Sequence, residues 1–197
     1  MSVASDTFDS MIGMGSGPGR YGILGVESSD PVLSLLSALG LAQTVGTALV
    51  IDMRRDLLVH GDRTLADVAA EGPSIGELSP GRSGVALMSS GPLAPGECRS
   101  VIEALGLNWP AIVIRCDRGH WEGPTVPVRP LLHGLLRPVE TSAAVWQPVS
   151  AGVRPSGPGP VLPRLGGSLT RHLLAGRVAR RSRWVRAWGP VWGLPWA

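Results

Sequence analysis

Short apolar runs alternate with helical patterns along the first two thirds of the chain. Four runs of five or six residues are bounded by polar or turn-forming residues, the length and setting of buried strands. They cover residues 21–26, 48–53, 84–88 and 111–116. We therefore predict four strands in this part of the chain.

Helix-start signals stand between these runs. Asp30 is a good N-cap residue and Pro31 suits the first helical position, and leucines recur at helical spacing from there to Gly46. Thr64 can cap a second helix through residue 70, and Pro95 opens a third that runs to about residue 105.

Alternating strands and helices predict an α/β fold, with a mostly parallel sheet and helices on both faces. The following segment, 126–136, contains Pro127 and Pro130. Because proline is tolerated at sheet edges, we predict an edge strand and a last turn there.

The chain divides by composition into four parts. A glycine-rich leader, predicted to be disordered, covers 1–20, and the α/β domain covers 21–140. A stretch rich in proline and glycine at 141–167 has the composition of a linker. An arginine- and tryptophan-rich tail covers 168–197.

Charge is divided unevenly between the body and the C-terminal part. All 18 basic residues are arginine, and the formal net charge is +3. Residues 1–140 hold all 15 carboxylates and 10 of the arginines, whereas 141–197 hold eight arginines and no carboxylate. A basic arm on an acidic body indicates an anionic partner.

The order of strand, loop, helix and a strand ending in Asp52 resembles the front of MinD/ParA-type P-loop ATPases. The resemblance covers 21 to about 136, and the branch it is most similar to is the CpaE/TadZ-like one, associated with pilus and secretion systems. It implies a P-loop-like fold with a nucleotide position at the carboxyl edge of the sheet.

The chain departs from that family where phosphate would bind. Family members use a glycine-rich loop with lysine and Ser/Thr, but this chain contains no lysine. Its loop has two carboxylates, and the family's pair of acids around Asp52 is broken by an arginine. The vestigial nucleotide-site positions are Glu27, Ser28, Ser29, Asp30, Asp52 and Arg54. We expect no catalytic residue, no cofactor and no metal there.

Two other chemistries have a weaker basis in the sequence. Cys116, Asp117 and His120 form half of a metal site, which His60 or His133 would have to complete; a buried cysteine and a surface histidine are the preferred interpretation. An unrecognised hydrolase using Asp52, Cys116 or His120 stays an alternative. Cys98 and Cys116 show no disulfide or zinc-ribbon pattern, which favours a reducing compartment.

The tail combines arginines with four tryptophans spaced four apart, at 184, 188, 192 and 196. This composition suits an anionic bilayer surface, single-stranded nucleic acid or an apolar groove of a partner protein. In a further alternative, the tail is disordered and its tryptophans fold back on the body. The residues expected to contact an anionic partner are Arg171, Arg177, Arg180, Arg181, Arg183, Trp184, Arg186 and Trp188.

The leading hypothesis is a non-catalytic, pseudo-ATPase-like scaffold or positioning factor that acts through this tail on a membrane surface or a protein. A nucleic-acid-binding accessory protein is the alternative from another class. We expect a cytoplasmic protein, peripheral at the inner face of the membrane, and a homodimer is compatible with this hypothesis. No secretory signal and no apolar run of membrane-spanning length stand in the sequence.

Overall fold

The computed structural model describes residues 22–54, 56, 63–74, 77, 84–134 and 141–196. Six strands form one sheet in the order β3-β2-β4-β1-β5-β6, and every neighbouring pair is parallel. The strands are β1 (Ile23–Glu27), β2 (Thr47–Asp52), β3 (Gly84–Ser89), β4 (Ile112–Cys116), β5 (Thr125–Leu131) and β6 (Val145–Pro148). The first four match the predicted runs to within two residues.

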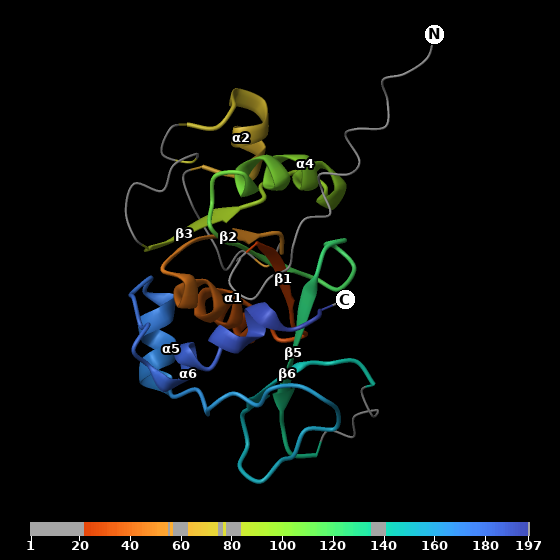
Figure 1. Ribbon diagram of the computed structural model, residues 1–197, viewed down its shortest axis with the longest axis vertical. Coiled ribbons are helices and arrows are strands. Elements are labelled where there is room, and N and C mark those ends of the chain that lie inside the picture. The colour runs from red at the N-terminus through yellow and green to blue at the C-terminus, as the bar shows by residue number, and fades with distance from the viewer. Residues whose placement is uncertain are drawn as a thin grey trace.

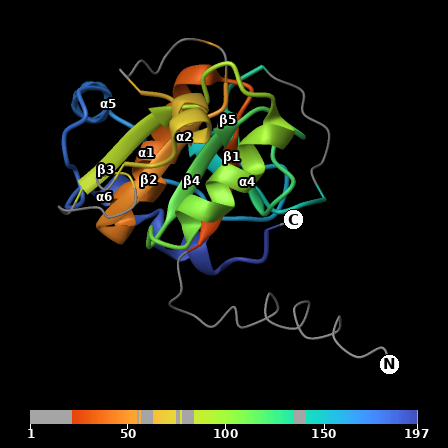
Figure 2. The ribbon, with the colours of Figure 1, turned by 90° about the horizontal axis from the view of Figure 1, so that it is seen from above.

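Helices cover both faces of this sheet. They are α1 (Pro31–Val45), α2 (Leu65–Glu71), α4 (Pro95–Gly106), α5 (Gly167–Leu174), α6 (Arg183–Arg186) and the 3-10 turn η1 (Gly189–Gly193). Figure 1 shows α2 and α4 on one side of the sheet and α1, α5 and α6 on the other. Figure 2 looks onto the α2 and α4 side. The parallel α/β fold predicted from the sequence is confirmed.

Helix α1 begins and ends as its sequence predicts. The Asp30 side chain accepts a hydrogen bond from the backbone N–H of Leu33 at 2.8 Å, and Pro31 is the first helical residue. Gly46, at φ 99°, ends the helix in a conformation that favours glycine. Eleven consecutive residues, 33–43, are buried, so the helix is enclosed on all sides.

The prediction that 126–136 supplies an edge strand is wrong. Strand β5 lies between β1 and β6, yet its register explains why two prolines are tolerated. Residues 125–127 pair with β1, and residues 128–131 pair with β6. Each half of β5 therefore pairs with a neighbour on one side only. Pro127 and Pro130 lack a backbone N–H, and at each of them hydrogen bonding is needed toward one neighbouring strand rather than two.

The proline- and glycine-rich stretch at 141–167 differs from the expected linker because it contributes β6 and part of the core. Trp146 on β6 is fully buried. Its backbone N–H donates to the carbonyl of Pro160 at 2.9 Å, and its own carbonyl accepts from Leu162 at 2.9 Å. Composition alone misled here because the prolines pack beside the strand rather than interrupting it.

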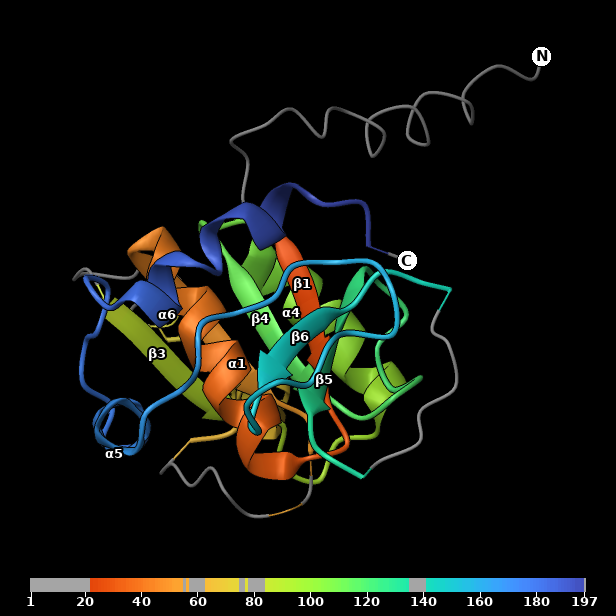
Figure 3. The ribbon, with the colours of Figure 1, turned by 90° about the horizontal axis from the view of Figure 1, so that it is seen from below.

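Residues 166–196, which we call the C-terminal cover, pack along the outer side of α1 (Figure 3). Trp184 meets the helix at Gly40, where a Cβ atom would lie 2.4 Å from the indole ring. Gln43 of α1 donates to the carbonyl of Arg177 at 3.1 Å and accepts from the N–H of Ala179 at 2.7 Å. The cover therefore completes the core on this face.

Two further sequence predictions concern the N-terminal leader and membrane-spanning segments. The predicted leader, 1–20, lies outside the described residues. In the described part of the chain, every helix is too short or too polar to cross a bilayer.

Candidate functional site

The carboxyl ends of β1, β2 and β4 meet at one edge of the sheet, as parallel strands require. This edge brings together the β1–α1 loop, Asp52 at the end of β2 and Arg54 just beyond it. It is the position that the resemblance to P-loop proteins singles out.

An arginine from β4 occupies the centre of this edge. Arg115 is fully buried, and its Nη1 donates to Asp52 Oδ2 at 2.6 Å. The same nitrogen donates to Asp56 Oδ1 at 2.8 Å, while Nη2 donates to the other Asp56 oxygen and, at 2.9 Å, to the Pro31 carbonyl. The guanidinium thus joins the start of α1 to two carboxylates.

A second arginine crosses the mouth of the same edge. Arg54 Nη1 donates to the Ser28 carbonyl at 2.7 Å, and its Nε lies 3.2 Å from Asp56 and 3.1 Å from Asp117. The backbone N–H of Arg54 also donates to Asp52 Oδ1 at 3.0 Å. We call Asp52, Arg54, Asp56, Arg115 and Asp117 the edge cluster.

The remaining predicted positions in the β1–α1 loop have separate roles. Glu27 lies 3.2 Å from Arg129 of β5, outside the edge cluster. Ser29 is exposed. Ser28 is buried and its hydroxyl accepts from the Asp30 N–H at 3.4 Å. Asp30 caps α1, so its carboxylate occupies the helix N-terminus.

Burial and ion pairing act against each other on the pKa values of Asp52 and Arg115. Burial raises the pKa of the Asp52 carboxyl above its usual range, and the Arg115 guanidinium offsets this only in part. Burial alone would lower the pKa of Arg115, but hydrogen bonds and charges of Asp56 and Asp52 outweigh it and raise that pKa. Arg115 therefore stays cationic, while ionised Asp52 is held at a cost.

The described contacts of the edge cluster oppose the binding of a phosphate group. Its three carboxylates outnumber its two guanidinium groups, and both terminal nitrogens of Arg115 already bind protein oxygens. The helix amides that would meet an anion are capped by Asp30. A nucleotide phosphate would have to displace these contacts and approach a net negative charge.

The Cys116, Asp117 and His120 group lies beside the edge cluster, and its thiol is buried. Burial raises the pKa of the Cys116 thiol to about 12, so the thiolate is scarce at neutral pH. Asp117 and the exposed His120 line a hollow of about 350 Å³ in front of α4. Within the described residues, no three His, Cys, Asp or Glu side chains are placed to share a metal ion.

The C-terminal site residues separate into two kinds. Trp184 and Trp188 are buried, with ring centroids 5.7 Å apart, and Trp184 Nε1 donates to Gln147 at 2.6 Å. The two rings are therefore withdrawn from any partner surface. The tryptophans pack on the body as that alternative held, but they do so from the segment that forms α6 and η1 and not from a disordered tail. The arginines whose side chains are exposed are Arg171, Arg177, Arg181, Arg183 and Arg186.

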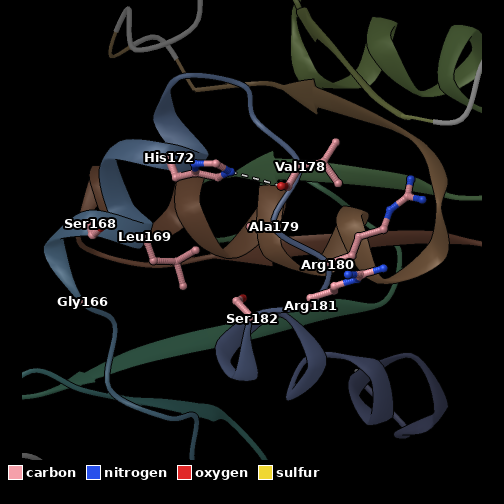
Figure 4. A pocket seen from close by; sticks show the side chains of 9 residues that line it. All are labelled: Gly166, Ser168, Leu169, His172, Val178, Ala179, Arg180, Arg181 and Ser182. Atoms are coloured by element: carbon pink, nitrogen blue, oxygen red, sulfur yellow. Dashed lines mark hydrogen bonds between the residues drawn. The ribbon is translucent and has the colours of Figure 1, made fainter.

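A pocket of about 730 Å³ lies between α5 and residues 178–182 (Figure 4). His172 Nε2 lies 3.1 Å from the Val178 carbonyl across it. In Figure 4 the Arg180 and Arg181 side chains extend away from α5, and the Arg180 guanidinium binds the Gly46 carbonyl at the end of α1. The sixth predicted arginine thus caps a helix rather than facing a partner.

Sequence reasoning missed Arg115 and Asp56. Arg115 carried a signal, because it is the one charged residue in an otherwise apolar buried strand, and such a charge requires a partner. Asp56 carried none, since no helix or strand pattern at this position indicates where its side chain would lie.

The fold is that of a parallel α/β protein, and ion pairs within the chain fill the edge where β1, β2 and β4 end. No protein-family model matches the chain, and neither does any curated protein or solved structure.

Proposed function

We propose that this protein is a non-catalytic scaffold or positioning factor with degenerate P-loop architecture of the MinD/ParA type, CpaE/TadZ-like. The edge cluster carries the proposal. A pocket that evolved to hold phosphate would present amides and cations to solvent, whereas this edge consumes both in contacts within the chain.

The surface proposed to meet a partner is the exposed arginine set of the C-terminal cover: Arg171, Arg177, Arg181, Arg183 and Arg186. Among the residues that the structure describes, none of these five forms an ion pair with a carboxylate. Unpaired guanidinium groups attract the phosphates of an anionic membrane surface, each contributing about 1 kcal/mol near the surface. The proposed location is the cytoplasmic face of the membrane.

Because Trp184 and Trp188 are buried, the proposed contact with the membrane is electrostatic and does not involve insertion of their rings into the bilayer. Their indole rings already pack against α1. The affinity for vesicles should therefore fall as salt is added, because salt screens the charges of exposed arginines. Binding should also leave the emission of these two tryptophans unchanged.

Vesicle cosedimentation tests this proposal with the full chain, because truncation would uncover α1. Arg177, Arg181 and Arg183 are replaced together by glutamine, and the control replaces Arg118, Arg154 and Arg164, which are also exposed and carry the same total charge. We expect binding to phosphatidylserine vesicles, at least about tenfold weaker in the first variant and nearly unchanged in the control.

Equal loss in both variants would reduce the proposal to a non-specific effect of net charge. Binding that persists at high salt would contradict an electrostatic contact. Preference for single-stranded DNA over vesicles, again lost in the first variant only, would favour the nucleic-acid-binding alternative.

A further inference from the structure

The two edge strands of the sheet, β3 and β6, differ in how their outer sides are paired. At one end, the outer side of β6 is paired by the chain itself: residues 158–162 run beside it, with Trp146 bridged to Val161. At the other end lies β3, whose inner side pairs with β2 along its whole length. Among the described residues, its outer side is met only at Ser89, by a single bridge to Thr64.

The residues of β3 itself do not discourage pairing at this outer edge. The strand reads GVALMS, without proline or charge, and Ala86 and Leu87 are exposed. Natural edge strands are usually blunted by charged residues, proline, bulges or a covering segment. Among the described residues, no segment pairs with residues 84–88 on this side, so their backbone groups can accept an extended strand.

An apolar groove of about 340 Å³ flanks the same strand on the α1 face. Among the described residues, three of the eight exposed large hydrophobic side chains line it: Val32 of α1 and Leu87 of β3 are each 42% exposed, and Leu174 of α5 is 49% exposed. The described lining residues are all uncharged; they are Val32, Leu35, Leu39, Gln43, Val85, Leu87, Leu173, Leu174 and Gly176.

We propose that this edge and groove form the interface of a homodimer in which β3 pairs antiparallel with β3 of a second copy. The two-fold axis would be perpendicular to the sheet and would pass between Ala86 of one copy and Ala86 of the other. Leu87 of each copy would then lie beside Val85 of the other. This register uses residues 84–88 and leaves the bridge between Ser89 and Thr64 intact. It joins two six-stranded sheets into one.

A second copy fits this surface better than a charged partner. The groove and the strand carry no charge, so a partner selected by charge gains nothing from them. Pairing the uncharged strand with itself brings no like charges together across the ladder and buries the apolar groove of both copies at once. The interface is independent of the arginine set proposed to meet a membrane.

Sedimentation velocity over a range of concentrations tests the dimer in the full chain. The wild-type chain should sediment with twice the 20.6 kDa mass of the monomer at high micromolar concentration. Leu87→Arg should raise the dimer dissociation constant by at least about tenfold, because the interface would have to bury an unpaired charge. Leu107→Arg is the matched control, since Leu107 is 86% exposed and lies at the end of α4.

Hydrogen exchange of the β3 amides provides the second measurement. Exchange in residues 84–88 should slow as concentration rises in the wild-type chain and in Leu107→Arg, but not in Leu87→Arg. A wild-type chain that stays monomeric would overturn the proposal and leave the edge to an extended segment of another protein. A dimer that survives Leu87→Arg, or that leaves β3 exchange unchanged, would overturn it as well.

Discussion

The edge cluster and the C-terminal cover distribute charge in opposite ways. In the edge cluster, charged side chains turn inward and neutralise one another, with Arg115 fully buried against Asp52. In the cover, tryptophans turn inward and most arginines turn outward. The sequence predicted a vestigial, phosphate-repelling edge, and it predicted a basic tail in place of the packed cover.

The contrast separates residues that stabilise the fold from residues that face solvent. The edge holds the start of α1 to β2 and β4 through ion pairs, so its charges are structural. The cover holds α1 from the other side through indole rings, and five of its arginines face solvent. A residue type alone therefore does not indicate role; its direction in the fold does.

Trp184→Ala should have the largest effect, because it removes a buried ring from the contact with Gly40 and leaves Gln147 without its donor. We expect the free energy of unfolding to fall by about 3–5 kcal/mol. Urea denaturation followed by circular dichroism measures this loss.

Leu194→Ala supplies the control for that measurement, since this residue of the cover is 38% exposed. It should change the free energy of unfolding by less than about 0.5 kcal/mol. If Trp184→Ala were as mild, the cover would be an appendage rather than part of the core.

Arg115→Lys should have an intermediate effect. An ammonium group keeps the charge but cannot serve Asp52, Asp56 and the Pro31 carbonyl at once, as the guanidinium does. The expected loss is about 1–3 kcal/mol by urea denaturation. Arg118→Lys makes the same chemical change at an exposed position and should be neutral; a neutral Arg115→Lys would show that charge alone suffices.

Asp52→Asn should give the smallest effect, and one that depends on pH. Because the pKa of Asp52 is raised in the folded state, its contribution is fully present below the unfolded value of about 3.9 and is lost as pH rises through the folded value. The stability of the wild-type chain relative to Asp52→Asn should therefore decline from acidic to neutral pH. A relative stability that increases over this range would mean that Arg115 outweighs burial and lowers the pKa.

Local signals predicted much of the fold. The Asp30 cap, the Pro31 start and four apolar runs located α1 and the first four strands, since each signal acts within a few residues. The Thr64 cap also holds, with Asp67 completing a capping box.

Signals that depend on distant partners were missed. Helix α1 is apolar on every side, which predicts a covering element, yet nothing local says that residues 166–196 supply it. Strand β6 was hidden because its neighbours are rich in proline. Of the edge cluster, Asp52 and Arg54 were found through the resemblance, whereas Arg115 and Asp56 depend on contacts 59 to 63 residues apart in the chain.

Calorimetric titration of the full chain with magnesium and ATP measures whether the ion-paired edge excludes a nucleotide. Because the edge cluster occupies the phosphate position with its own ion pairs, we expect no saturable heat of binding. A micromolar Kd for ATP that is lost in Asp52→Ala would contradict it.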